Sequence, residues 1–501
     1  MSVFRKIFAF LPRLFCILAG CMLAGLILLV MFGEPAFSFA YQDRSPLPHW
    51  LTGCAGLAAA AALLWFGTRA APAKEQSLWR LVLLFGLVLV IQLLIARCCW
   101  ARLGWDPGTM HTTAEELARG LPISAAEYFT VCPNNAPLTL IFAALMWVAV
   151  KFGLAVPYVV LPYFNAVLLN PSAFVTVLCV RKLTRNSMAR MFALVVSIVW
   201  LAFSPYITYP YSDTFSILFP VLSLLLYLSV QKPFVKWLLI SLLCFFGAAI
   251  KPTVLIVLIA LIVLGVFEFL SKRNDKDWWK RGIAIAAALM MGAIPGQAFQ
   301  KAATASLAGS AVPEKQLSLT HYLMLGMNGT TYGGHSTDDV AFSQSFPTLA
   351  ERESANLQRA WERVSGRSAA ENIKFFTIKA YKAYADGTFA SQGSFLPVEI
   401  PRRTDSLSLF LRSLYHKRGQ LMPACHALIQ CLWLGILCLS AVACFRQRKC
   451  SLISLLGLTL IGLTAYLLLF EVWPRYLFLY APFFVILASA AFDKPTIRVL
   501  E

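Results

Sequence analysis

This sequence has few charged residues, and acidic residues are the scarcest of them. Only 13% of its 501 residues are charged, with 24 Asp and Glu against 43 Lys and Arg, and 59% are hydrophobic. The mean hydropathy is +0.70. So small a polar fraction excludes a soluble domain of this length. Repeated apolar runs of about 17–25 residues predict membrane-spanning helices instead.

Several chemical motifs are missing as well. The sequence has no CxxC redox motif, and most of its 13 cysteines lie inside apolar runs, where they behave as small hydrophobes. Its 6 histidines are scattered without metal-site spacing. We find no repeat of fixed period and no low-complexity tract. The sequence therefore predicts neither a dithiol redox site nor a structural metal site.

The excess of positive charge gives the orientation of the chain. A net charge of +19 in a soluble protein would suggest nucleic-acid binding. Here the cations form short clusters between apolar runs, as the positive-inside rule describes, and we exclude nucleic acid as a partner. The clusters are Arg5/Lys6/Arg13, Arg69/Lys74/Arg80, Arg181/Lys182/Arg185/Arg190, Lys232/Lys236, Lys272/Arg273/Lys276/Lys280/Arg281, Arg446/Arg448/Lys449 and Lys494/Arg498.

Placing every cluster in the cytoplasm requires one choice. If residues 138–152 spanned the membrane, the basic loop 181–190 would lie outside, so we interpret 138–152 as a juxtamembrane helix. The first apolar run, 14–33, is too long for a signal-peptide core and is interpreted as an uncleaved anchor. The predicted crossings are 14–33, 50–68, 81–98, 157–180, 188–206, 214–230, 236–250, 252–270, 282–298, 424–444, 452–470 and 476–492.

The predicted fold class is an all-α polytopic membrane protein with about 12 transmembrane helices and both termini in the cytoplasm. It divides into an N-terminal hairpin, a core with an outer loop, an extracytoplasmic region and the last helices. The ranges are 1–80, 81–298 with loop 99–135, 299–423 and 424–501. We expect 299–423 to be a small mixed region lying on the membrane domain. Short amphipathic helices are expected after Thr113, over 349–365 and around 375–381.

Two acidic residues stand out because each lies where an apolar segment meets the outer face. They are Asp106, within Gly104-Trp105-Asp106-Pro107-Gly108, and Asp213, within Tyr209-Pro210-Tyr211-Ser212-Asp213. A carboxylate at such a boundary is costly and usually has a chemical role. The predicted topology brings further polar side chains to the same face: Glu127, Asn134, Asn135, Lys251, Glu471 and Arg475. All of these except Glu471, together with Tyr476, are our candidates for binding the substrate.

This layout resembles the GT-C superfamily of integral membrane glycosyltransferases, in the branch of protein O-mannosyltransferases and lipid A aminoarabinose transferases. Gly104-Trp105-Asp106 matches the family's outer-loop Asp, and Tyr211-Ser212-Asp213 matches an Asp at the outer end of a later helix. Cys132-Pro133-Asn134-Asn135 matches a turn before a juxtamembrane helix, and Glu471 to Tyr476 resembles a late polar turn. The resemblance runs from about 81 to 492 and rests on layout and short motifs; the hairpin 14–68 departs from it.

The resemblance implies a glycosyltransferase that uses a sugar linked to polyprenyl phosphate. Its acceptor would be a lipid, glycan or protein outside the cytoplasmic membrane. Asp106 would be the general base, and Asp213 would orient the acceptor or help to bind a divalent metal. Lys251 and Arg475 are our candidates for binding the phosphate, since Arg grips two phosphate oxygens and Lys acts as a point charge.

Each of these residues also has a structural interpretation. Asp106-Pro107-Gly108 is a good turn sequence, and Asp213 is placed to cap a helix at Thr214. Lys251 is placed to snorkel at a helix end. Glu471 and Arg475 are four residues apart, as in a helical ion pair, and their aromatic neighbours suit an interfacial belt. We therefore assign a functional role to Arg475 and none to Glu471.

The main alternative function is a flippase for lipid-linked sugars or another transporter. A transporter is expected to carry charges near the bilayer midplane and paired broken helices. The predicted midplane stretches are nearly uncharged and the charges gather at one face, which favours an enzyme over a transporter or a structural scaffold. The Gly-rich stretch 321–335 is interpreted as a surface loop, and His335, Asp338 and Asp339 lack the spacing of a metal site.

Overall fold

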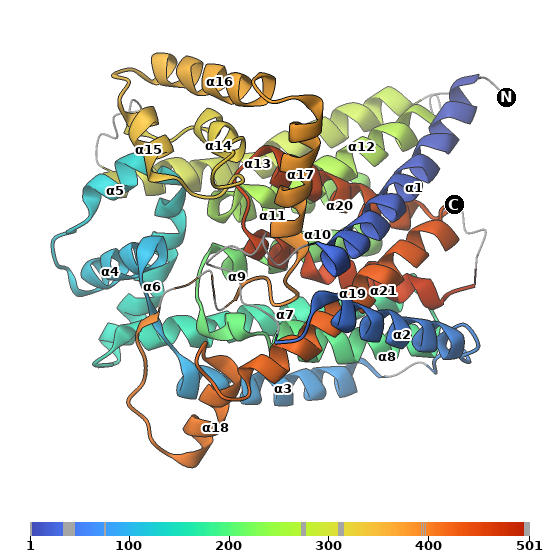
Figure 1. Ribbon diagram of the computed structural model, residues 1–501, viewed down its shortest axis with the longest axis horizontal. Helices are drawn as coiled ribbons and strands as arrows, with labels where there is room; N and C mark the ends of the chain where they lie inside the picture. The colour runs from blue at the N-terminus through green and yellow to red at the C-terminus, as the bar shows by residue number, and fades with distance from the viewer. Residues whose placement is uncertain are drawn as a thin grey trace.

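The computed structural model describes residues 3–33, 46–74, 77–271, 277–308, 315–391, 393, 395 and 397–494. Over these residues the chain is a helical bundle, with 12 helices long and apolar enough to cross a membrane (Figure 1). Two short antiparallel strands, β1 (Arg102–Leu103) and β2 (Pro397–Glu399), are the described sheet. The predicted fold class, an all-α polytopic membrane protein, is confirmed.

The long helices of the bundle are α1 (Val3–Phe32), α2 (His49–Gly67), α3 (Leu78–Cys99), α7 (Val160–Leu183), α8 (Ser187–Val196), α10 (Leu218–Ser229), α11 (Pro233–Ile250), α12 (Leu255–Ser271), α13 (Trp278–Ala308), α19 (Met422–Arg446), α20 (Ser451–Leu469) and α21 (Ala481–Ser489). The helices α8 and α21 are continued within their apolar segments by η4 (Ser197–Ala202), η5 (Pro205–Thr208), η8 (Pro474–Tyr480) and η9 (Ala490–Phe492).

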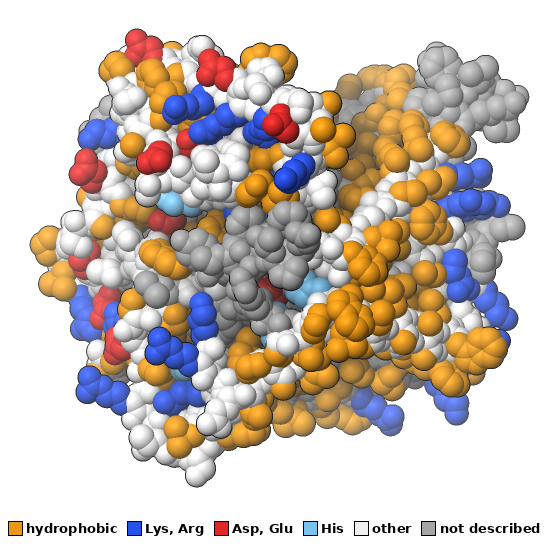
Figure 2. Space-filling model, in the orientation of Figure 1, with side chains coloured by type: hydrophobic (Ala, Val, Ile, Leu, Met, Phe, Trp, Pro, Cys, Tyr) orange, Lys and Arg blue, Asp and Glu red, His pale blue; other side chains and the backbone are white. Residues whose placement is uncertain are grey.

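One end of the bundle gathers the loops rich in Lys and Arg. Here Asn186 Nδ2 donates to the carbonyl oxygens of Gly67 at 2.9 Å and Phe492 at 3.1 Å, and Gln447 Nε2 donates to that of Asp493 at 3.0 Å. We call this the basic end and the opposite one the site end. On the face shown in Figure 2, acidic side chains gather on the left, towards the site end, and Lys and Arg line the right-hand edge. Of the basic residues noted in the sequence, Lys272, Arg273, Lys276 and Arg498 lie outside the described residues.

Helix α6 (Ala136–Lys151) belongs to Pro133–Lys151, one of the 12 apolar segments, yet it begins and ends at the site end. At its start, Gln300 Nε2 near the end of α13 donates to the Pro133 carbonyl at 3.4 Å. Just after its end, Arg119 donates to the Ala155 carbonyl at 3.1 Å. A helix with both ends on one side does not cross the bundle, which is the arrangement we expected of a juxtamembrane helix.

Helix α12 crosses the bundle although its apolar segment, Pro252–Phe267, is shorter than the 12 segments above. Its neighbours α11 and α13 run parallel, because the residue numbers of their close contacts increase together. A Cβ at Gly292 would lie 2.6 Å from Ser241 Cβ, and a Cβ at Gly296 would lie 2.5 Å from the Phe245 carbonyl carbon. Because α12 links two parallel helices, it must return from the site end to the basic end. Counting α12 in place of α6 keeps the total at 12.

The region after α13 is helical over its described residues, with β2 as its short strand, and not the mixed region expected. Its helices are α14 (Leu319–Gly326), α15 (Thr337–Gln344), α16 (Leu349–Ser365), α17 (Ala369–Tyr384) and α18 (Ser406–Tyr415). The helix predicted over 349–365 is confirmed as α16, and the one around 375–381 is part of α17. The predicted start at Thr113 is wrong, because α4 (Trp105–Arg119) already begins at Trp105.

Candidate functional site

A buried cluster of charges forms where three chain segments meet at the site end. Asp213 comes from α9 (Ser212–Ser216), Lys251 follows α11, and Arg475 lies in η8. Lys251 Nζ is 2.6 Å from Asp213 Oδ1, and Arg475 Nε is 3.9 Å from Asp213 Oδ2. The Asp213 carboxylate is fully buried and the two cations are nearly so. One carboxylate therefore faces two cations inside the protein.

Local backbone features bring Asp213 and Lys251 into this position. The backbone N–H of Tyr211 donates to Thr214 Oγ1 at 3.2 Å, and α9 begins at Ser212. Asp213 thus lies in the first turn of α9 and is not its cap, so the capping interpretation is wrong. Pro252 ends α11, because a residue before proline disfavours helical angles, and Lys251 is extended with φ −149° and ψ 109°. Its side chain turns inward to Asp213 rather than snorkelling to the surface.

The guanidinium of Arg475 lies among aromatic rings and has unused hydrogen-bonding capacity. Its Cζ is 5.0 Å from the Tyr211 ring centroid, 5.5 Å from Tyr476 and 5.8 Å from Phe395. Its Nε is buried and has no hydrogen-bond partner among the described residues, and the same holds for Asp213 Oδ2. These two atoms face each other at 3.9 Å, which is too long for a hydrogen bond, so Arg475 and Asp213 form an ion pair in which neither atom is hydrogen-bonded.

Lys251 is held in a low-dielectric environment. Burial lowers the pKa of its amine below the ordinary value, while the negative charge of Asp213 opposes this shift. Its Nζ also lies 4.3 Å from the centroid of the Tyr476 ring. Because the 2.6 Å contact with Asp213 is that of a charge-assisted hydrogen bond, we take Lys251 as the protonated partner of a buried ion pair.

Glu471 does not pair with Arg475 among the described interactions, so the expected helical ion pair is wrong. Its carboxylate accepts hydrogen bonds from Trp473 Nε1 and Tyr476 Oη, each at 3.0 Å. The physical reason is that Glu471 precedes η8, whose 3₁₀ geometry starts at Pro474, so no α-helix places residues 471 and 475 on one face. Glu471 positions the two aromatic residues that surround Arg475.

Asp106 lies at the same end, in the first turn of α4, and its side chain is exposed. Tyr211 links it electrostatically to the cluster: burial raises the pKa of the Tyr211 phenol, the negative charges of Asp106 and Asp213 raise it further, and Arg475 opposes them. The negative charges of Asp106 and Asp213 therefore both raise the pKa of the same phenol. The preceding Trp105 has φ 54°, a left-handed conformation that bulky residues rarely adopt and that often marks a functional turn.

The remaining predicted residues are divided between this region and the surface. Asn135 is buried and donates from Nδ2 to Tyr128 Oη at 2.6 Å, and Asn134 donates to Asn135 Oδ1 at 3.2 Å. Burial and then the charge of Asp106 raise the pKa of Tyr128, so the Asn pair adjoins the Asp106 side. Glu127 is 83% exposed at its side chain and contacts Lys315 at 3.4 Å, away from the buried cluster.

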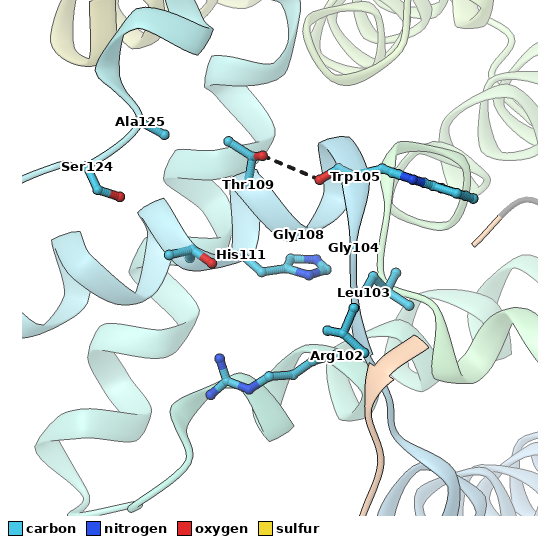
Figure 3. Close-up of a pocket in the computed structure, with 11 residues that line it drawn as sticks. Arg102, Leu103, Gly104, Trp105, Gly108, Thr109, His111, Ser124 and Ala125 are labelled. Carbon is cyan, nitrogen blue, oxygen red and sulfur yellow. Dashed lines mark hydrogen bonds between the residues drawn. The ribbon is translucent and has the colours of Figure 1, made fainter. Parts of the chain in front are cut away.

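An open pocket of about 390 Å³ lies on the other side of the α4 turn (Figure 3). Arg102, Gly104, Thr109 and Ser124 are among its lining residues. Figure 3 shows the Trp105 indole pointing away from Ser124 and Ala125 on the opposite side of the view. Asp106 and the three charges of the buried cluster do not line this pocket, so it is a neighbour of the candidate site.

Sequence analysis missed the two lysines of α17. Lys379 is fully buried, and its Nζ donates to the carbonyls of Gly326, Leu468 and Phe470 at 2.6, 2.8 and 2.7 Å. Lys382 Nζ donates to the Thr331 carbonyl at 3.0 Å. The interpretation of this segment as an amphipathic helix does not predict buried lysines that donate to backbone carbonyls. The one feature of the sequence that indicates them is two lysines three residues apart.

These bonds connect the Gly-rich stretch 321–335 to the charge cluster. The prediction of a surface loop is wrong for its first part, because residues 321–326 belong to α14 and His321 and Asn328 are buried. The backbone N–H of Val472 donates to the Gly333 carbonyl at 2.8 Å, so the loop packs on the segment that leads to Arg475. In the same region Asp339 pairs with Arg363 at 2.6 Å and accepts a hydrogen bond from Asn328 at 2.8 Å. Asp339 therefore serves the loop's structure. Among the described residues no group of three or more His, Cys, Asp or Glu side chains is placed to hold a metal.

In comparison with known protein families, a family described as conserved hypothetical integral membrane proteins matches residues 69–496. The chain belongs to this family. The match covers the bundle from the end of α2 to the end of α21 and includes every residue of the buried charge cluster. No curated protein and no solved structure matches the chain.

Proposed function

We propose that this family member is a membrane glycosyltransferase that moves a sugar from a polyprenyl-phosphate donor to an acceptor on the extracytoplasmic side. The observation that carries the proposal is the pair of buried cations at one end of the bundle: Lys251, and Arg475, whose Nε makes no hydrogen bond among the described residues. A planar guanidinium suits a phosphate better than any other common anion except a carboxylate. A lipid phosphate at the end of a membrane bundle supplies such an anion.

In this proposal the phosphate is the leaving group. As the bond between the anomeric carbon and the phosphate oxygen breaks, negative charge grows on the phosphate, and fixed cations lower the barrier. Arg475 binds the phosphate through its guanidinium N–H groups. Lys251 contributes positive charge from its pair with Asp213, 2.6 Å away.

Asp106 is the proposed general base. Within the described residues its exposed carboxylate takes part in no hydrogen bond or ion pair, which leaves it available to an acceptor hydroxyl. It takes the proton while the acceptor oxygen forms a bond to the anomeric carbon from the face opposite the phosphate. This displacement inverts the configuration at that carbon.

Asp213 has a different role from the one implied by the family resemblance. Its carboxylate is fully buried between two cations, at 2.6 and 3.9 Å, so it serves as their counter-charge. The neighbouring cations also repel a divalent ion, and these residues do not fit a metal at Asp213. We therefore propose no metal-dependent step at this residue.

The position of the charges favours an enzyme over a transporter. Asp213, Lys251 and Arg475 each lie at the start or end of their helical segments, at one end of the bundle. A transporter is expected to bind its substrate near the middle of the membrane, between broken helices. A cluster at the membrane boundary instead allows a lipid phosphate to meet an acceptor in water.

The decisive experiment compares Asp106→Asn with the wild type in membranes supplied with labelled polyprenyl-phosphate sugars. We expect transfer to fall by about 10²–10⁴-fold, the usual effect of losing a general base. Glu127→Gln is the matched control, because this acidic residue lies at the same end but on the surface, and it should retain transfer. Normal transfer by Asp106→Asn would remove the catalytic assignment.

A second pair of variants tests phosphate binding separately. Arg475→Lys keeps the positive charge but loses the two-pronged donor, so the donor KM should rise about 10–100-fold with a smaller change in kcat. An acceptor KM that rises instead, with the donor KM unchanged, would place Arg475 on the acceptor side.

A further inference from the structure

Helix α18 packs Leu411 and Leu414 against the core but leaves three other large apolar side chains exposed. Ser408 and Tyr415 are buried against the protein, whereas Leu407, Leu409 and Phe410 are 50%, 55% and 53% exposed. Asp405 caps the helix by accepting a hydrogen bond from the Ser408 N–H at 3.0 Å. A surface helix in water shows the reverse pattern, so the outward apolar side chains require an apolar neighbour.

The contacts of α18 place it at the edge of the membrane. Arg412 Nε donates to the Cys98 carbonyl at 3.2 Å, and His416 Nε2 lies 3.1 Å from the Cys99 carbonyl oxygen. Cys98 and Cys99 end the membrane-spanning helix α3. Figure 1 shows α18 at the lower edge of the view, below α3. It therefore lies at the level where hydrocarbon gives way to lipid headgroups.

The outward face of α3 indicates where the lipid begins. Val82, Leu83 and Leu87, in its first half, are each more than half exposed, and Ile91 and Leu94, in the half that ends at Cys99, are 40% and 39% exposed, as expected of side chains that face hydrocarbon. Because α18 is attached to the end of this lipid-facing helix, its exposed Leu and Phe residues are within reach of the same leaflet.

Cations flank α18 on both sides. Arg402 and Arg403 precede it, Lys417 and Arg418 follow it, and all four are exposed. The only acidic residue from 402 to 418 is Asp405, whose carboxylate is already engaged as the helix cap. Basic residues beside an interfacial helix attract anionic lipid headgroups, with about 1 kcal/mol for each Lys or Arg near the surface.

We infer that α18 is an interfacial helix whose apolar face enters the leaflet at the site end and whose flanking cations bind anionic phospholipid headgroups. The strand β2 connects this helix to the α4 turn: Arg102 and Glu399 are paired in the β1–β2 ladder and joined by a 3.1 Å ion pair. Lipid binding at α18 thus holds the strand next to the turn that carries Asp106. The inference does not depend on glycosyl transfer.

The test measures hydrogen exchange of the full chain in nanodiscs. We compare discs of phosphatidylcholine with discs in which part of it is replaced by phosphatidylglycerol. Peptides covering 404–418 should exchange at least about 10-fold more slowly in discs with the anionic lipid than in neutral discs. Added salt should reverse much of this protection. Peptides from α3 should not change, which controls for the fold.

Two sets of variants separate charge from apolar contact. In Arg402→Gln/Arg403→Gln/Lys417→Gln/Arg418→Gln the response to phosphatidylglycerol should be lost. Leu407→Ser/Phe410→Ser should reduce protection in both kinds of disc. Lys374→Gln, at an exposed residue of α17, is the matched control and should behave as the wild type.

Two results would overturn the inference. The first is exchange over 404–418 that is the same in neutral and anionic discs for the wild type. The second is protection that rises with the number of protein copies per disc at constant lipid composition, which would assign the apolar face to a second copy of the chain. Neither result bears on the Asp106→Asn test, so the two proposals fail separately.

Discussion

The charge cluster predicts unequal effects for its two ion-pair partners. Asp213→Asn removes the only carboxylate that faces both Lys251 and Arg475 among the described residues, and so leaves two buried cations without a counter-charge. Lys251→Met leaves Asp213 with Arg475, whose Nε is 3.9 Å from Asp213 Oδ2. A small side-chain movement then restores a close pair. We therefore expect Asp213→Asn to destabilise the protein more than Lys251→Met.

The magnitude follows from the two distances. With an effective dielectric constant of about 20, a pair at 2.6 Å interacts by about 6 kcal/mol and a pair at 3.9 Å by about 4 kcal/mol, before desolvation is subtracted. Breaking a buried pair by removing one partner costs about 3–5 kcal/mol in net terms. We assign that range to Asp213→Asn. For Lys251→Met we expect about 1–2 kcal/mol, since Arg475 compensates.

The measurement is the free energy of unfolding in mixed micelles, with the double variant Asp213→Asn/Lys251→Met completing a cycle. Removing Lys251 when Asp213 is already absent relieves repulsion between two cations. The double variant should therefore be more stable than Asp213→Asn alone, by about 1 kcal/mol or more. If Asp213→Asn proved no less stable than Lys251→Met, or if the two effects simply added, Asp213 would not be the shared counter-charge.

The other predictions concern the lysine of α17 and the packing of α2. Burial lowers the pKa of Lys379 to about 7, below its usual 10.5. Between these pH values the unfolded chain binds more protons than the folded one, so the stability of the wild type relative to Lys379→Met should rise as pH increases from about 7 to 10. Thermal unfolding of both proteins across this pH range measures the difference, and a difference that does not change with pH contradicts the prediction. Gly56→Ala would place a Cβ in steric conflict with the Cys431 carbonyl oxygen of α19, so we expect a loss of about 1–3 kcal/mol in the free energy of unfolding. Gly86→Ala is the control, because a Cβ at that position would meet no atom of another described segment within 4 Å, and equal effects of the two substitutions would refute the packing argument.

Chain topology was accessible from the sequence because it depends on local composition. Apolar length and Lys/Arg clusters predicted the crossings, including the treatment of 138–152 as a helix that stays at one end. The helix over 349–365 was also predictable, since the capping box of Thr348 and Glu351 is a local signal. In contrast, the start of α4 was misplaced because Asp106-Pro107-Gly108 suits a turn and a first helical turn equally well.

The partners of the charged residues were not accessible in the same way. Glu471 and Arg475 are close in sequence, yet they have different partners because the backbone between them is not α-helical. Lys251 and Asp213 are 38 residues apart and meet only through the packing of α11 on α9. The sequence identified these residues as candidates without indicating which carboxylate would pair with which cation.

The amino-acid sequence on its own determined that this protein is a multi-pass helical bundle with its cations grouped between the helices. That much follows from the cost of exposing backbone and charge to lipid, which acts on each segment separately. Only the tertiary structure decided that Asp213 is buried between Lys251 and Arg475, and that Leu407, Leu409 and Phe410 of α18 are exposed. Such pairings depend on distances between segments remote in the chain, and no local pattern fixes those distances.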